Sequence, residues 1–230
     1  MIEWSSLLWL ALTIILFQIF TWIFHFFKRF SLLQPVALSI AALVVLLLMF
    51  KVEYKAYFEG GRFLHYLLGP STVALAIPLY EKRAKLFSLW KPLSFSLVAG
   101  SLFGILSALA VGKIFGASLL ILKSVGAKSV TTPIAIGITE KVGGDISLTA
   151  VMVIATGIFG AIAGLTFLRL FPFKSEEAQG FAMGMACHGI GTARCFQESV
   201  ELGTFAGLAI GLNGLVTAFL LPIVFRLLGL

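Results

Sequence analysis

Two polar interruptions lie inside the most apolar parts of the chain. The first, KSVTTPIAI, begins at Lys128, and the second, ACHGIGTARC, begins at Ala186. Each combines a cation and hydroxyl groups with Pro or with paired Gly, which break a membrane helix and leave backbone groups unpaired. The N-terminus of a helix that restarts after such a break carries partial positive charge and binds anions. The two interruptions therefore predict a substrate site for a small anion.

The candidate substrate-binding residues come from both interruptions. In the first, Pro133 suits the first position of a new half-helix, and Thr132 is placed to cap it. In the second, Gly189 and Gly191 permit an unwound backbone, and Thr192 is placed to cap the helix that follows. The candidates are Lys128, Ser129, Thr131, Thr132, Pro133, His188, Gly189, Gly191, Thr192 and Arg194, with Ser71 and Thr72 as secondary candidates.

Each of these features also has a simpler interpretation. Gly and Pro are common in membrane helices as packing residues and kinks. Lys128 and Arg194 could extend to the membrane surface, and a single histidine such as His188 is more often a hydrogen-bonded structural residue than a ligand group. None of the ten acidic residues lies within either interruption. Because buried cations need a partner, we expect a substrate carboxylate to neutralise Lys128 and Arg194.

The composition defines an all-α, polytopic membrane protein. Of the 230 residues, 60% are hydrophobic and 12% are charged, whereas soluble domains average roughly 25% charged residues. The apolar runs are about 20 residues long, the length of a transmembrane helix. The net charge of +7 comes from short cationic clusters between these runs. Such clusters are typical of the cytoplasmic loops of a membrane protein, as the positive-inside rule describes, and not of a nucleic-acid-binding surface.

The apolar runs predict six to eight membrane spans in one domain of residues 1–230. Uninterrupted runs cover residues 5–26, 33–50, 63–80, 93–115, 146–171 and 202–228. The interrupted runs cover residues 117–141 and 175–200. Eight spans result if both interrupted runs cross the membrane, seven if one does, and six if both are re-entrant hairpins that enter from opposite faces. We expect their interruptions to meet near the midplane, as in transporters with inverted repeats.

Two further patterns concern packing and orientation. Gly157, Gly160 and Gly164 lie near one face of the run at 146–171, which favours close packing against another helix. Cationic clusters at residues 28–29 and 81–91 belong on the same side of the membrane, which the positive-inside rule identifies as the cytoplasmic side.

Several classes of function find no support in the sequence. No set of nucleophile, base and orienting residue stands out, and no cluster has the spacing of metal ligands. The phosphate-binding pattern G-x-x-x-x-G-K-[ST] is absent. Cys187 and Cys195 give no disulfide framework and are expected to be packing residues. We therefore expect a protein without enzymatic activity, metal or cofactor.

The chain resembles the LrgB/CidB family of bacterial membrane proteins over nearly its whole length. The likeness is carried by GPSTVALAIPLYE, KSVTTPIAI and GMACHGIGTARCFQES. It implies a multi-pass protein of the bacterial cytoplasmic membrane and two functional descriptions. One is holin- or antiholin-like control of murein hydrolases and lysis, together with a small LrgA/CidA-type membrane partner. The other is transport of a short carboxylate such as pyruvate or glycolate, because the plastid glycolate/glycerate translocator is a relative.

We favour secondary transport of a small organic anion, and the lysis regulator is the alternative. A simple lesion-forming holin would not need two interrupted segments with cations and hydroxyl groups, whereas carriers use such segments to bind substrate. The expected partners are the anion, the lipid bilayer and the LrgA/CidA-type protein, in a homo- or hetero-oligomer.

Overall fold

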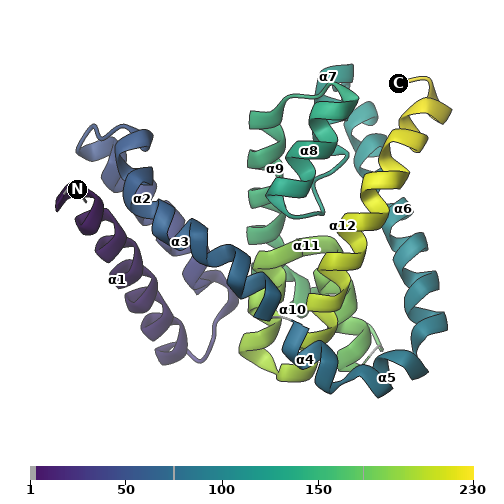
Figure 1. Cartoon of the computed structure of the whole chain (residues 1–230), viewed down its shortest axis with the longest axis horizontal. Coiled ribbons are helices and arrows are strands. Elements are labelled where there is room, and N and C mark those ends of the chain that lie inside the picture. The colour runs from purple at the N-terminus through teal and green to yellow at the C-terminus, as the bar shows by residue number, and fades with distance from the viewer. Residues whose placement is uncertain (1–3, 75, 173) are drawn as a thin grey trace. The chain divides into compact units, whose positions relative to one another are not determined.

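The computed structural model describes residues 4–74, 76–172 and 174–230, and these contain helices and no strand (Figure 1). The chain separates into two compact units, residues 1–76 and 77–230, and each is described by itself. Among the described residues, four helices are long and apolar enough to cross a membrane, namely Ser6–Phe26, Trp90–Ile114, Ile146–Leu168 and Val200–Leu228. The prediction of an all-α, multi-pass membrane protein is confirmed.

The first unit is a bundle of three helices. It contains α1 (Trp4–Phe26), a short turn η1 (Ser31–Leu33), α2 (Pro35–Met49) and α3 (Tyr54–Ala74). α1 packs against both α2 and α3. Pro35 opens α2, because a proline at the first helical position loses no hydrogen bond. The helix that contains the start of the predicted run at residues 63–80 begins earlier than that run, since α3 already begins at Tyr54 with residues that tolerate a helix.

The second unit combines long helices with short segments. Two short helices, α4 (Ala76–Glu81) and α5 (Arg83–Ser88), lead into α6 (Trp90–Ile114). A continuous span is formed by α9 (Ile146–Phe159), the π-helical turn η2 (Gly160–Gly164) and α10 (Leu165–Leu168). The interrupted runs of the sequence form α7 (Leu119–Val125) with α8 (Thr132–Val142), and α11 (Glu176–Glu198). The last helix is α12 (Val200–Leu228).

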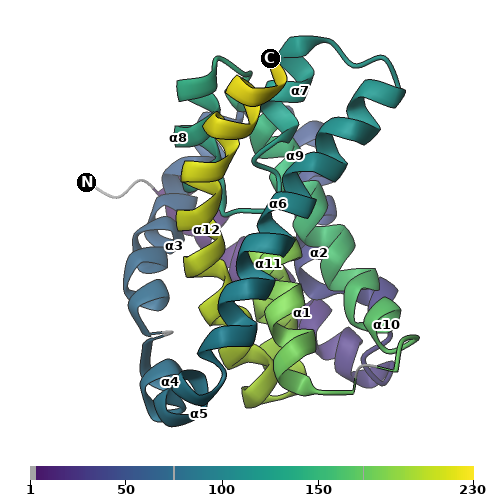
Figure 2. The same cartoon turned by 90° about the vertical axis from the view of Figure 1, so that its right-hand side faces the viewer.

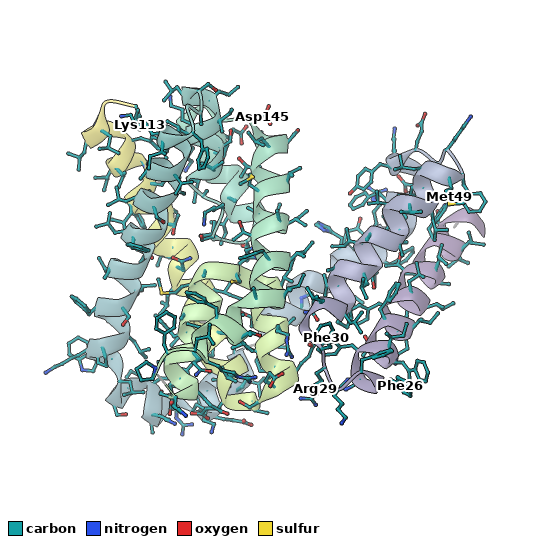
Figure 3. All side chains as sticks on the ribbon, turned by 180° about the vertical axis from the view of Figure 1, so that it is seen from behind. Phe26, Arg29, Phe30, Met49, Lys113 and Asp145 are labelled. Atoms are coloured by element: carbon teal, nitrogen blue, oxygen red, sulfur yellow. The ribbon has the colours of Figure 1, made fainter. Side chains whose placement is uncertain are left out.

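α7 and α8 form a re-entrant hairpin, here called hairpin 1 (residues 118–145). The chain returns to the level of α7 after α8, because the backbone N–H of Asp145 donates to Ser124 Oγ of α7 at 2.8 Å. Lys113, at the end of α6, and Asp145, before α9, lie at the same end of the second unit (Figure 3). Between these ends the chain descends until Ser129 lies beside Gly104 of α6. The chain therefore enters the unit and returns without crossing it.

α11 is also folded back on itself, and it forms hairpin 2 (residues 175–199). Ser199 Oγ donates to Glu176 Oε2 at 2.7 Å, although 23 residues separate them. A straight helix of this length would be about 34 Å long, so the helix must reverse. The reversal lies at His188, whose φ of 41° and ψ of −138° are not helical. Two arms, residues 176–187 and 189–198, result.

The two hairpins enter the second unit from opposite ends. Figure 2 shows α7 and α8 in the upper half of this unit and α11 in the lower half. The span from α9 to α10 leads from the end of hairpin 1 to the start of hairpin 2. A span followed by a hairpin thus occurs twice, first as α6 with hairpin 1 and then as α9–α10 with hairpin 2. The two pairs run in opposite directions, as in an inverted repeat. Among the arrangements left open by the sequence, the two opposed hairpins are present, and the described residues provide four helices of spanning length together with the shorter apolar α2, in place of the six spans expected with them.

The hairpin tips meet at the middle of the surrounding spans. Met185 of hairpin 2 lies against Gly100, and Ser129 of hairpin 1 lies beside Gly104, in the centre of the 25-residue α6. His188 contacts Gly157 near the centre of the span Ile146–Leu168. Because these spans are long enough to cross the bilayer, their centres lie near its midplane. The expected meeting of the two interruptions is therefore present in the fold.

The glycines of α9 and η2 fit hairpin 2 closely. A Cβ at Gly157 would lie 2.6 Å from the His188 ring, and one at Gly164 would lie 2.5 Å from Met183 Sδ. A Cβ at Gly160 would overlap Cys187 Sγ. The prediction that these glycines allow close helix packing is confirmed, and hairpin 2 is the partner.

Candidate functional site

A cavity of about 570 Å³ lies in the second unit among α6, α12 and the two hairpins. It extends from Leu89 and Glu177, at the end where hairpin 2 enters, to Lys128 and Ser129 at the tip of hairpin 1. Much of the lining is apolar, with Phe, Leu, Ile and Met side chains. An interior of this kind, with a few convergent polar groups, is typical of a small-molecule site.

Lys128 is the cation of this cavity. Its side chain is partly buried, and its ammonium group donates a hydrogen bond to Ser129 Oγ at 3.2 Å. The ion pairs found within residues 4–74, 76–172 and 174–230 do not include Lys128. An ammonium group removed from water without an opposite charge is costly. The site therefore favours a ligand that brings its own negative charge.

Asn213 joins both hairpin tips, although the sequence analysis did not single it out. Its Nδ2 donates to the carbonyl oxygens of Ser129, at 3.2 Å, and of Met185, at 3.0 Å. Its Oδ1 accepts from Ser101 Oγ at 2.7 Å and from Thr217 Oγ1 at 3.3 Å. One side chain on α12 thus contacts hairpin 1, hairpin 2 and α6. The sequence feature that could have identified Asn213 is its position as a single Asn in the middle of an apolar run, where a polar side chain is usually functional.

His188 occupies the reversal of hairpin 2 but does not line the cavity. It is 5% exposed, and its Nε2 lies 2.8 Å from the carbonyl oxygen of Val153. Only a protonated Nε2 can donate this bond. These contacts favour the simpler interpretation of His188 as a structural residue that holds hairpin 2 against α9.

Arg194 has an acidic partner, which contradicts the expectation that only a substrate could neutralise it. Its Nη2 pairs with Glu198 Oε1 at 2.6 Å, and the same carboxylate binds Arg169 at 3.0 Å. Residues four positions apart face each other on a helix, so Glu198 reaches Arg194 from within the same arm. We therefore place Arg194 in the packing of hairpin 2 and not in the proposed binding site.

The capping residues differ from those expected. Thr131, not Thr132, is the N-cap of α8, and Pro133 takes the second helical position and is exposed. Thr132 cannot cap because it already belongs to the first helical turn. Thr192 is not a cap either, because helical structure resumes directly after His188 and buries Thr192 inside the second arm.

The remaining candidates have different surroundings. Gly189 is exposed at the reversal of hairpin 2, and a Cβ there would meet no heavy atom of the described residues within 4 Å. A Cβ at Gly191, in contrast, would lie 2.5 Å from that of Cys187. Gly191 therefore lets the two arms pack. Ser71 and Thr72 belong to α3 in the first unit, and their side chains lie outside the described part of the structure.

Ion pairs fix the entrance end of hairpin 2. Lys85 of α5 binds both Glu177 and, at 2.6 Å, Glu201, and Lys82 binds Glu201 at 2.7 Å. The hydrogen bond from Lys85, together with one from Ser175, lowers the pKa of Glu177 to about 2. Hydrogen bonds to Glu177 and Glu201 raise the pKa of Lys85. This cluster ties α5 to the start of hairpin 2 and to the start of α12.

We expect Lys85→Gln to lower the thermal unfolding midpoint of the purified protein by a small amount that vanishes in about 1 M salt, because exposed ion pairs are screened. A folded-state pKa below the ordinary value means that this stabilisation is present above about pH 4.5 and is lost as the pH falls toward 2. Lys91→Gln is the control, since Lys91 is in none of the ion pairs of the described residues. Equal effects of both substitutions would contradict this role for Lys85.

These features define a class: a multi-pass helical membrane protein in which two opposed re-entrant hairpins meet beside a cavity with one cation. The chain belongs to the LrgB-like family, whose model matches residues 13–227.

Several relatives match over most of their length. The holin-like protein CidB of Staphylococcus epidermidis is 29% identical over 223 residues, and that of Staphylococcus aureus is 28% identical over 229 residues; each match covers 97% of both chains. The uncharacterized protein YxaC of Bacillus subtilis is 34% identical over 200 residues, which cover 86% of this chain and 87% of YxaC. No solved structure matches the chain.

Proposed function

We propose that this protein is a secondary carrier, or the transport subunit of one, for a small organic anion such as pyruvate or glycolate. The observation that carries the proposal is Lys128, a cation without an ion-pair partner among the described residues, in a cavity where two hairpin tips meet. A carboxylate supplies the missing charge, and Ser129 is placed to add a hydrogen bond.

The hairpin architecture supports transport on physical grounds. Non-helical backbone in the middle of a bilayer must face protein or a watery cavity, because each unpaired group would cost several kcal/mol in lipid. Here the non-helical residues around Lys128 face the cavity. Carriers place substrate sites at such breaks near the midplane, where they can be reached from either side in turn.

Charge gives the proposed orientation. The end where hairpin 2 enters carries six Lys and Arg residues: Lys82, Arg83, Lys85, Lys91, Arg169 and Lys174. The opposite end of the second unit carries four: Lys113, Lys123, Lys141 and Arg226. The positive-inside rule places the first end in the cytoplasm of a bacterial cell. The cavity then opens toward the cytoplasm.

A second candidate function is favoured by the names of the relatives, several of which are holin-like proteins. In that case the protein regulates murein hydrolases and lysis in the membrane, together with a small LrgA/CidA-type partner. The two functions differ in what crosses the bilayer: a carrier passes one class of solute, whereas a holin opens a lesion.

Reconstituted vesicles separate the two functions. Vesicles containing the protein, with and without the LrgA/CidA-type partner, are loaded with unlabelled acid and a fluorescent dye and given labelled pyruvate or glycolate. The carrier proposal predicts saturable exchange of the acid and retention of the dye. Dye release without saturable exchange would instead support the holin-like function.

A further inference from the structure

The amide of Asn213 has no hydrogen-bonding capacity left over. A carboxamide offers two N–H donors and a carbonyl oxygen with two lone pairs. In this protein the donors bind the carbonyls of Ser129 and Met185, and the oxygen accepts from the hydroxyls of Ser101 and Thr217. The side chain is 2% exposed. Three of these bonds hold neighbouring elements, and the fourth, from Thr217, lies within α12 itself.

The orientation of this amide is fixed by chemistry. If the oxygen and nitrogen were exchanged, the amide oxygen would face two carbonyl oxygens, and neither of them can donate a hydrogen bond. With the observed orientation, the nitrogen bridges residues that are 56 positions apart in the chain, at 129 and 185. These residues belong to different hairpins, and Asn213 is the point at which their backbones are connected.

We propose that Asn213 is a positioning residue that locks the tips of the two hairpins to each other and to α6. The lock fixes the peptide of Ser129, whose hydroxyl accepts from the Lys128 ammonium group. Asn213 thereby sets where the cation points through the Ser129 peptide, while its own polar atoms are all engaged by protein groups. The inference rests on the proposed function only in treating Lys128 as the anion-binding group.

The lock can be measured without any substrate, because the chain has two cysteines and both are buried. Cys187 lies at the tip of hairpin 2, and Cys195 lies deeper in its second arm. In a Cys195→Ala background, Asn213→Leu should make Cys187 react with a maleimide about tenfold faster or more, as expected for the loss of one to two hydrogen bonds. In a Cys187→Ala background, the same substitution should leave Cys195 unreactive.

The tip of hairpin 1 needs its own reporter. Ala127 is fully buried, and Ala127→Cys in a chain without the native cysteines adds only one sulfur atom. Asn213→Leu should speed labelling at this position as well. Faster maleimide labelling at both Cys187 and Ala127→Cys, with Cys195 still unreactive, supports the proposal that Asn213 holds both tips. Acceleration at one tip alone, at none, or at all three positions equally would overturn it, the last because it indicates general loosening.

Two further variants keep the test decisive if Asn213→Leu does not fold. At a pH at which its carboxyl group is ionised, Asn213→Asp keeps the shape and the oxygen that accepts from Ser101 but has no donor for the tips, so it should act like Asn213→Leu. Thr217→Val is the matched control, because it removes a bond to Asn213 and leaves both tip bonds in place. It should leave the labelling rates near those of the wild type, and rates as fast as those of Asn213→Asp would overturn the proposal.

Uptake measurements on the same variants separate this inference from the function. If the wild type transports a carboxylate, Asn213→Asp should raise its half-saturating concentration, because Lys128 is no longer held in place. If no carboxylate is transported by the wild type but the tips loosen as described, the proposed function fails and the lock stands. Unchanged labelling in an active carrier would overturn the lock and leave the function intact.

Discussion

Gly184→Ala is expected to prevent the normal packing of hairpin 2 against α12. A Cβ at Gly184 would overlap the backbone carbonyl of Ala206 and would lie 2.8 Å from its Cα. Because the obstacle is the backbone of a long helix, it cannot move aside as a flexible side chain would. Overpacking of this kind costs about 1–3 kcal/mol and sometimes more, and here it acts beside the Met185 backbone that forms part of the site.

A matched glycine on α12 makes the Gly184 prediction specific. A Cβ at Gly207 would have no heavy atom of the described part of the chain within 4 Å, so Gly207→Ala should be tolerated. In a helix interior, Ala is favoured over Gly by about 1 kcal/mol, so the control is not expected to destabilise the protein. Thermal unfolding in detergent and the labelling rate of Cys187 would be compared for both variants. Equal behaviour of the two variants would contradict the close packing described for hairpin 2.

Lys128→Ala is expected to weaken carboxylate binding by about 10- to 150-fold, which corresponds to roughly 1.5–3 kcal/mol for a charge-assisted hydrogen bond. Lys128→Arg should be milder, because it keeps the charge and changes the geometry. The measurement is the affinity of the purified protein for pyruvate or glycolate.

Lys123→Ala is the control for Lys128, since Lys123 also lies in hairpin 1 but does not line the cavity. It should leave carboxylate affinity close to that of the wild type. If Lys128→Ala binds as tightly as Lys123→Ala, the anion does not depend on the cation of the cavity, and the site must be sought elsewhere.

Much of this fold follows from local sequence patterns. Pro133 and the glycines around His188 mark the two breaks, because these residue types disfavour a continuous helix and the effect does not depend on tertiary structure. The glycines at 157, 160 and 164 likewise indicate a close contact from their spacing alone. The helix boundaries are less certain from sequence, as the shift of the α8 cap from Thr132 to Thr131 shows.

The composition of the site was harder to predict, because it depends on which elements meet. Asn213 lies in a run that is otherwise apolar, and only the fold shows that it reaches two distant backbones. The ion pair of Arg194 could have been predicted from the sequence, because Glu198 follows Arg194 by four positions and residues at this spacing face each other on a helix. The prediction missed it because Glu198 lies outside the break itself, one helical turn further along the arm.

The central claim is that the site forms where two re-entrant hairpins, entering from opposite sides of the membrane, meet. Labelling of single cysteines in membrane vesicles with an impermeant maleimide tests it most directly, in a chain without the native cysteines. The exposed positions at or near the ends of the hairpins are Lys113 and Lys141 for hairpin 1, and Lys174 and Val200 for hairpin 2. The structure predicts that the first two label from one side of the membrane and the last two from the other. Labelling of positions 113 and 141 from opposite sides would mean that the segment between them crosses the bilayer, and would contradict the account.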